Sequence, residues 1–297
     1  ERTKYQCADY IGDSYRSLNN ILDDKMASNM IIRLREVRVT REQTLRKLYS
    51  WVGDLRNAAD EDIRVDVDEA VLSTAAFIFD RYLSTFVPGY VAGEAGAPSQ
   101  ARVIGVGCLF IAAKSQMSHS EVFRISMFFG DCDGYARAIF ANSVELQILK
   151  ELNWDVVYPS PISIIRDLLT LLPSPLEKYK TDVLNLSTYL TRLATVAYGF
   201  ITKFSPSTIA LATLMIIFKN ECACPRIALY DLVDATIHLN TTFKVYELGL
   251  SFDDEDVKEC REEMLDVLKK DLHRGIIVAT KRSCPSPNKV TEMDVIG

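Results

Sequence analysis

The stretch that decides the fold is Val144-Glu-Leu-Gln-Ile-Leu-Lys-Glu-Leu-Asn-Trp-Asp-Val156. Upstream of it lie Asp80-Arg-Tyr-Leu-Ser84 and the apolar run Val103-Ile-Gly-Val-Gly-Cys-Leu-Phe-Ile-Ala-Ala-Lys114. Apolar residues recur in these stretches at steps of three and four, which indicates helices, and alternating strand-like patterns are nearly absent from the 297 residues. The sequence therefore predicts an all-α protein.

The same spacing predicts a five-helix unit over residues 40–157, after a helical extension over residues 1–39 with an amphipathic segment at 9–21. Thr40 with Gln43 matches a capping box and would start the first helix of this unit, and Ser118 with Glu121 would start the fourth. The other helices are expected over residues 66–86, 99–114 and 134–153. A loop rich in Gly and Pro is expected between residues 86 and 99.

A second five-helix unit is expected over residues 158–275, because Ser160-Pro161 matches an N-cap followed by proline at the first helical position. Its helices are predicted over residues 161–172, 181–203, 206–219, 225–239 and 253–272. The apolar run 208–219 parallels the run 103–114 and has small residues at similar places, which indicates an internal duplication around two buried axial helices. Residues 276–297 are expected to form a mobile tail.

The composition limits the partners and the compartment. A net charge of −6 argues against a surface built to neutralise phosphates, so no nucleic-acid partner is expected. Seven cysteines, an odd number, indicate a reducing intracellular compartment, nuclear, cytoplasmic or both. The longest apolar run, Ile209 to Phe218, is about half the length of a membrane-spanning helix, so we expect a soluble protein and no membrane partner.

The motifs of catalysis and cofactor binding are missing. The three histidines are not spaced as metal ligands, and Cys222 and Cys224 have no second ligand pair at zinc-site spacing. Neither a phosphate-binding loop with its Lys-Ser/Thr nor a Gly-x-Ser-x-Gly elbow occurs. We therefore expect no metal, no cofactor and no catalytic residue, and the chain is not predicted to be an enzyme.

Lys114 and Glu145 stand in apolar surroundings without an oppositely charged residue three or four positions away. A buried charge without a partner is costly, so these two side chains would pair with each other, with backbone carbonyls or with another protein. The alternative for Lys114 is an interaction with the carboxyl end of its helix, and for Glu145 a solvated position at a helix edge.

The succession of motifs resembles the cyclin box, closely over residues 40–156 and more loosely to Leu272. Lys114 and Glu145 fall where the cyclin family keeps the Lys and Glu that hold its kinase. The resemblance implies two tandem cyclin boxes and a heterodimer with a cyclin-dependent Ser/Thr kinase, in which both residues hydrogen-bond main-chain groups beside the kinase C-helix. The apolar contacts that it implies are Ile111, Leu149, Trp154 and Val156.

The implied mechanism is allosteric. The bound chain would hold the kinase C-helix in the orientation that completes the kinase's own Lys-Glu pair, and it would contribute no catalytic atom. The role could lie in the cell cycle and cell division, in transcription or in nutrient signalling. Two alternatives from the same fold are a IIB-like transcription factor and a scaffold that has lost kinase binding.

The chain departs from the cyclin pattern at two places. Ser115, Gln116 and Met117 replace an aromatic residue and an acidic pair after the family lysine. The family's docking groove for Arg-x-Leu motifs of substrates and inhibitors is matched by Leu48, Trp51 and Asp54, but Lys47 replaces an apolar residue and Arg102 a Gln. Because Lys47 and Arg102 would repel a basic peptide, we expect poor docking in this groove.

Three further motifs have simple interpretations. Asp80 and Arg81 fit the family's Asp-Arg-Phe/Tyr-Leu-Ser turn and are expected to hold helix ends together. Ser286-Pro287 matches a proline-directed phosphorylation site. The acidic run at residues 253–256 is expected to begin the last helix, where carboxylates complement the helix dipole.

Overall fold

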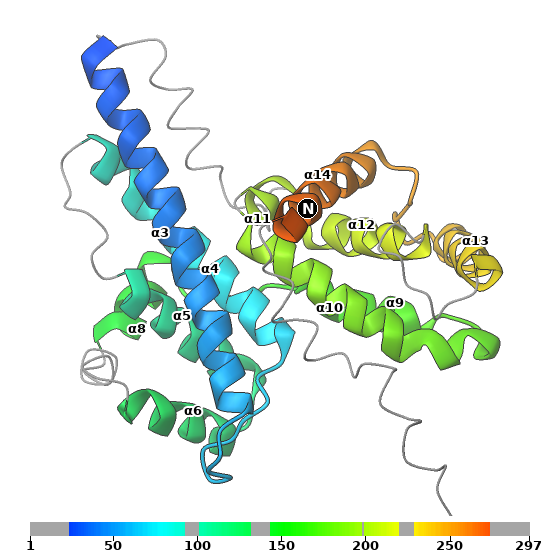
Figure 1. Cartoon of the computed structure of the whole chain (residues 1–297), viewed down its shortest axis with the longest axis horizontal. Helices are drawn as coiled ribbons and strands as arrows, with labels where there is room; N and C mark the ends of the chain where they lie inside the picture. The colour runs from blue at the N-terminus through cyan, green and yellow to red at the C-terminus, as the bar shows by residue number, and fades with distance from the viewer. Residues whose placement is uncertain (1–23, 93–100, 132–142, 198, 220–228, 274–297) are drawn as a thin grey trace, which may run out of the picture.

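The computed structural model describes residues 24–92, 101–131, 143–197, 199–219 and 229–273. Within these ranges the chain forms helices and no strand, which confirms the all-α prediction. Two helical units follow each other along the chain and lie side by side (Figure 1). The expected segment at residues 9–21, the tail at 276–297, Ser286, Cys222 and Cys224 lie outside the described residues.

The first unit is built around a central apolar helix. It consists of α3 (Asp24–Arg56), α4 (Glu69–Ala92), α5 (Ala101–Gln116), α6 (His119–Asp131) and α8 (Ser143–Glu151). Helix α5 packs against α3, α4, α6 and α8, and every residue from 105 to 113 is buried. The predicted axial helix of this unit is therefore confirmed.

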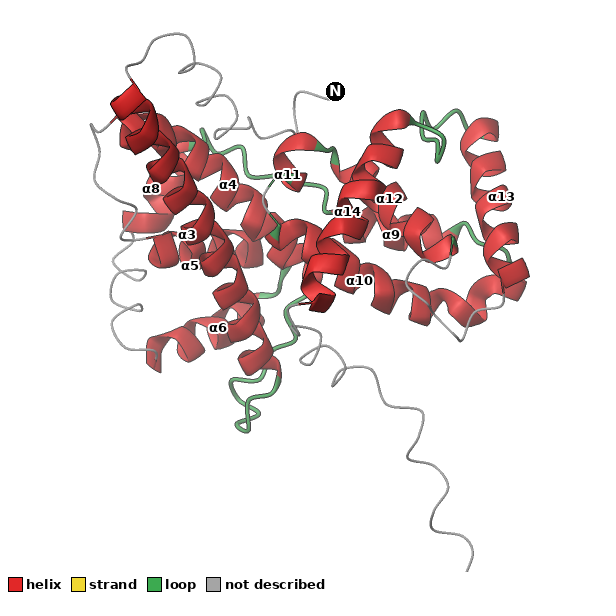
Figure 2. Ribbon diagram, turned by 45° about the horizontal axis from the view of Figure 1, so that its top comes forward, coloured by secondary structure: helices red, strands yellow, loops and turns green. Residues whose placement is uncertain are grey.

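The second unit repeats this plan around α12 (Pro206–Phe218), which is buried along residues 209–218. The helices α9 (Pro161–Thr170), α10 (Lys180–Val196), α13 (Leu229–Val245) and α14 (Glu255–His273) pack against α12. A 3-10 helix, η1 (Ser174–Tyr179), and a short helix, α11 (Phe200–Lys203), complete the unit. Figure 2 shows α12 lying between its neighbours, as α5 does in the first unit.

Two predicted helix starts are confirmed by their caps. The Ser160 hydroxyl accepts a hydrogen bond from the Ser163 amide at 3.2 Å, and Pro161 occupies the first turn of α9. The Ser118 amide donates to the Glu121 carboxylate at 2.9 Å, while the Ser118 hydroxyl accepts from the Glu121 amide at 3.4 Å. The second arrangement is a reciprocal capping box, and it fixes the start of α6.

Three other predicted boundaries are wrong. Helix α3 runs without interruption from Asp24, so Thr40 does not start a helix, and the boundary expected between residues 39 and 40 falls inside α3. The loop expected from residue 86 begins later, because α4 continues to Ala92. The helix predicted over residues 181–203 is broken after Val196, where Gly199 takes a left-handed φ of 104°.

Two glycines of α5 permit its close approach to neighbouring helices. A Cβ added to Gly105 would lie 2.6 Å from Cγ2 of Thr44 on α3. A Cβ added to Gly107 would lie 3.0 Å from Cγ1 of Val144 on α8. Glycine at these two positions thus sets how closely α3 and α8 pack on the central helix.

Polar side chains join the two units. Arg41 on α3 is 1% exposed, donates to both carboxylate oxygens of Asp80 at 2.6 and 2.8 Å, and also donates to the carbonyl oxygens of Thr195 and Val196 at 3.0 and 2.7 Å. The expected structural role of Asp80 is therefore confirmed. Through Arg41, Asp80 is also linked to Thr195 and Val196 at the end of α10. Apolar contacts also join the two units, because Val196 of α10 belongs to the hydrophobic core of the first unit.

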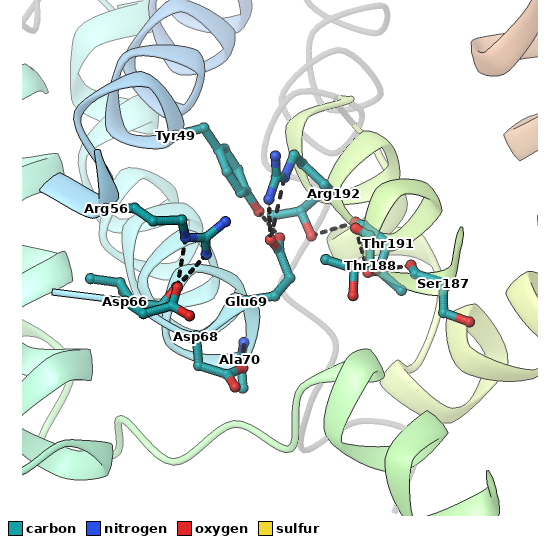
Figure 3. Close-up of polar contacts among 12 residues, drawn as sticks. Tyr49, Arg56, Asp66, Asp68, Glu69, Ala70, Ser187, Thr188, Thr191 and Arg192 are labelled. Atoms are coloured by element: carbon teal, nitrogen blue, oxygen red, sulfur yellow. Dashed lines mark hydrogen bonds and ion pairs between the residues drawn. The ribbon is translucent and has the colours of Figure 1, made fainter. Parts of the chain in front are cut away.

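A second polar cluster in this junction centres on Glu69 at the start of α4 (Figure 3). Its carboxylate is 3% exposed, accepts from the Tyr49 hydroxyl at 2.6 Å and lies 2.9 Å from Nη2 of Arg192 on α10. Burial raises the pKa of the Glu69 carboxyl, and the neighbouring Arg192 guanidinium only partly offsets this effect. Asp80 and Glu69 are thus both buried carboxylates of this junction, and each is paired with an arginine.

By length and composition alone, helix α4 is long and apolar enough to cross a membrane. The qualifying stretch, Glu69–Val87, is 19 residues long, but 78% of its best window is buried inside the structure. Such burial is typical of the core helix of a globular protein. The stretch in α4 is longer than the apolar run at residues 209–218, on which the expectation from the sequence was based.

Candidate functional site

Lys114 and Glu145 form an ion pair at the surface of the first unit. Lys114 lies in the last turn of α5 and Glu145 in the first turn of α8, and Nζ and Oε2 are 2.6 Å apart. Among the partners expected for these two residues from the sequence, the structure shows one: the two side chains pair with each other. The pair joins the end of the central helix to the start of α8.

This pair differs in exposure from the buried pairs of the junction. The Lys114 side chain is 54% exposed and the Glu145 side chain 19%. An ion pair with one exposed partner contributes about 1 kcal/mol or less to folding, because water and salt screen it. Both groups can therefore exchange this contact for hydrogen bonds to another molecule at small cost.

The first unit also exposes apolar side chains on α8 and in the segment that follows it. Trp154 is 64% exposed, and two residues that the sequence did not single out, Leu146 and Val157, are 41% and 73% exposed. Leu149 and Val156 are partly buried, while Ile111 is only 6% exposed and belongs mainly to the core. Of the predicted apolar contacts, Trp154 offers the most accessible side chain, and Ile111 offers little.

The turn that carries Trp154 has an uncommon backbone conformation. Asn153 and Trp154 have φ values of 51° and 61°, in the left-handed region that non-glycine residues rarely adopt. The Trp154 amide donates to the Leu149 carbonyl at 2.8 Å, and the Arg81 guanidinium donates to the Asp155 carbonyl. Arg81 thus holds the end of this turn, as expected, and the turn presents an aromatic ring to solvent. Conformations of this kind cluster at functional sites.

Of the three residues that depart from the cyclin pattern, Ser115 and Gln116 are the last two of α5, and Met117 follows the helix. The Ser115 hydroxyl donates to the Ala112 carbonyl at 2.7 Å, and the side-chain amide of Gln116 donates to the Thr74 hydroxyl at 2.8 Å. Met117 is partly buried against the core. Ser115 and Gln116 therefore make contacts within the fold, and Gln116 ties α5 to α4.

The two apolar residues of the expected docking groove, Leu48 and Trp51, are covered. Leu48 is 1% and Trp51 8% exposed, the Trp51 ring packs edge-on against Phe129 at 5.4 Å, and Lys47 Nζ lies 5.1 Å from the Trp51 ring centre. Asp54 and Arg102 are exposed. Lys47 would repel a basic peptide at Trp51, and poor docking of such peptides stays a prediction.

No group of three or more His, Cys, Asp or Glu side chains among the described residues could hold a metal ion. Cys108 and Cys260 are buried, and burial raises the pKa of both thiols. A thiol held in its protonated form is a poor nucleophile and a poor metal ligand. These two cysteines therefore act as core residues.

Comparison with known proteins decides the family. The family model of the cyclin N-terminal domain matches residues 24–157, and that of the cyclin C-terminal domain matches residues 159–289. The chain belongs to the cyclin family. The first match begins at Asp24, where α3 begins, so the whole of this helix falls inside the N-terminal cyclin domain. Proteins of this family are regulators rather than enzymes, and this cyclin has the tandem arrangement of the two domains.

A solved structure gives a further comparison. This cyclin is 19% identical to a viral cyclin from herpesvirus saimiri, with a TM-score of 0.45, and the match covers 76% of this chain and 86% of the viral one. The comparison with curated proteins gives no match.

Proposed function

We propose that this cyclin is the regulatory subunit of a cyclin-dependent Ser/Thr kinase. The proposal is supported by the Lys114–Glu145 ion pair together with the exposed apolar side chains of Leu146, Trp154 and Val157 on α8 and in the segment after it, and we call these five residues the pair face. Apolar side chains around a few polar groups are the composition of an interface core, whereas a surface that faces only water needs no such cluster.

The chemistry of the pair face suits a helix end or a loop of a kinase. The Lys114 ammonium would donate to main-chain carbonyls of the kinase, and the Glu145 carboxylate would accept from its main-chain amides. In the unbound cyclin each group satisfies the other, so neither charge is left without a partner before the kinase arrives. Binding then exchanges one set of charged hydrogen bonds for another while the apolar side chains leave water.

The consequence for the kinase would be allosteric. A regulator that contacts the kinase C-helix and favours one of its orientations shifts the kinase toward the state in which its catalytic Lys-Glu pair forms. The cyclin would supply this differential contact and no catalytic atom. Docking of substrates or inhibitors would involve Leu48, Trp51, Asp54 and Arg102. Lys47 lies over Trp51 and opposes the docking of a basic peptide there.

The test is to capture kinases from a cell extract with the wild-type chain and with a Lys114→Ala/Glu145→Ala double variant, and to assay the captured material for Ser/Thr kinase activity. The matched control is Glu255→Ala/Lys258→Ala, which removes an exposed ion pair of 2.7 Å on α14. We expect the wild type and the control to capture an active kinase and the double variant to lose it. Capture of no kinase by the wild type, or equal capture by all three chains, would contradict the proposal.

A further inference from the structure

Helix α13 lies at the end of the second unit, away from α5 and α8 of the first (Figures 1 and 2). One of its faces is buried, and α13 packs on α12. The buried residues of that face are Leu232, Ala235, Leu239 and Phe243. The remaining face of α13 is open in the described structure.

The open face carries a stripe of large apolar side chains. Val233, Ile237 and Val245 are 49%, 58% and 68% exposed, and the exposed Thr241 fills the intervening step of four. Residues four apart lie on one side of a helix, so these side chains form a continuous surface about 18 Å long. Exposed apolar side chains that gather on one face of a helix mark an interaction site more often than a solvated surface does. We call Val233, Ile237, Thr241 and Val245 the α13 stripe.

Two exposed charges border the α13 stripe and suggest which partner it takes. Asp234 lies near its start and Lys244 near its end, five residues on either side of Leu239. If two copies of α13 pack antiparallel about a two-fold axis at Leu239, Asp234 of one copy comes level with Lys244 of the other. The same operation brings Val233 level with Val245 and Ile237 level with Thr241. The face is thus complementary to itself in both charge and apolarity, as a two-fold interface requires.

We propose that the α13 stripe is a self-association surface through which two copies of this cyclin form an antiparallel, two-fold dimer. Each interface would contain two Asp234–Lys244 contacts, one on each side of the axis. Because α13 lies away from α5 and α8, the helices that carry Lys114 and Glu145, a dimer built in this way leaves both pair faces open (Figure 1). Self-association therefore does not depend on the proposed kinase binding and can be tested without a kinase.

The first test is sedimentation equilibrium on the full chain between about 1 and 200 µM, the range in which a small helix-helix interface would assemble. We expect a reversible rise in mass from 33.4 kDa toward twice that value. Ile237→Asp should keep the chain monomeric over the whole range, because it places two carboxylates at the centre of the interface. Phe123→Asp on α6 is the control, since Phe123 is 64% exposed and should leave the dimer unchanged.

A charge-reversal series then tests the geometry. Asp234→Lys alone and Lys244→Asp alone each put like charges level with each other and should raise the dimer dissociation constant about tenfold. The double variant, Asp234→Lys with Lys244→Asp, should return it close to the wild-type value. A wild type that stays monomeric, a dimer that survives Ile237→Asp, or a double variant no better than the single ones would overturn the proposal. Circular dichroism of each variant would show that it is folded.

Discussion

The carboxylate of Glu69 in the first domain lies 2.9 Å from the guanidinium of Arg192 in the second, and the two groups differ in their access to water. The Glu69 side chain is 3% exposed, whereas that of Arg192 is 33% exposed. Loss of Arg192 would leave a buried charge whose remaining hydrogen bond, among the described residues, comes from the Tyr49 hydroxyl. Loss of the Glu69 charge would leave a cation that can still reach water. The pair therefore predicts an asymmetric response to mutation.

The first prediction concerns this asymmetry. Arg192→Met should lower the free energy of unfolding by about 3 kcal/mol, because it leaves the Glu69 carboxylate uncompensated in the junction. Glu69→Gln should cost only about 1 kcal/mol, since the amide can keep the Tyr49 contact and Arg192 can turn to solvent. The double variant should cost less than the sum of the two. Urea denaturation of the four proteins completes the cycle.

A control for this cycle is Arg56→Met, which removes the exposed pair between Arg56 and Asp66, whose side chains are 48% and 77% exposed. That change should alter the free energy of unfolding by about 0.5 kcal/mol or less. Equal costs for Arg192→Met and Glu69→Gln, or costs no larger than that of Arg56→Met, would show that burial of the Glu69 carboxylate does not govern the junction.

A second prediction follows from the raised pKa of Glu69. Burial raises this pKa above the ordinary value for glutamate, so the folded protein holds the Glu69 proton at a pH where the unfolded chain has released it. The stability that Glu69 contributes is thus fully present below the pKa that its carboxyl has in the unfolded chain. It is lost as the pH rises through the pKa of the carboxyl in the folded protein. The free energy of unfolding of wild type relative to Glu69→Gln should therefore fall with rising pH across that window and become constant above it. A difference that does not change with pH, or one that grows with pH, would refute the raised pKa.

Local sequence signals predicted helix starts where the chemistry is local. Ser160 and Ser118 cap helices through residues three positions away, so the pattern contains the whole interaction. The same kind of signal failed at Thr40, because the apolar spacing continues upstream through Leu34 and Val37, which are buried in the core. A capping pattern inside an amphipathic stretch therefore does not by itself start a helix.

Part of the candidate site, the pair of Lys114 and Glu145, could also be predicted from the residues near each member in the sequence. Lys114 and Glu145 have no oppositely charged residue three or four positions away, and the structure pairs them across 31 residues. Nothing local marked Glu69 and Arg192, which are 123 residues apart, or Arg41, whose partners lie 39 and about 155 residues away. Contacts between domains depend on how whole helices pack, and a single sequence without that packing does not show them.

The third prediction uses two glycines in different surroundings. Gly105→Ala would place a methyl group 2.6 Å from Cγ2 of the buried Thr44, so the Thr44 side chain or α3 must shift, at a net cost of about 1–3 kcal/mol. Gly53 lies near the end of α3 with no atom within 4 Å of an added Cβ, and Gly53→Ala should stabilise the protein by about 0.5–1 kcal/mol through helix propensity. Thermal unfolding of both variants measures the two effects, and a stabilising Gly105→Ala would mean that α3 and α5 are less closely packed than the structure indicates.

The last prediction separates binding from folding at Trp154, and it rests on the proposed kinase partner. Because the Trp154 side chain is 64% exposed, Trp154→Ala removes little contact from the core and should leave the unfolding temperature nearly unchanged. An exposed aromatic residue at the centre of an interface contributes strongly to affinity, so kinase binding should weaken at least tenfold. Phe123→Ala, at the same 64% exposure on α6, should leave kinase affinity unchanged. Titration of the captured kinase with the three chains measures this difference, and equal affinities would remove Trp154 from the pair face.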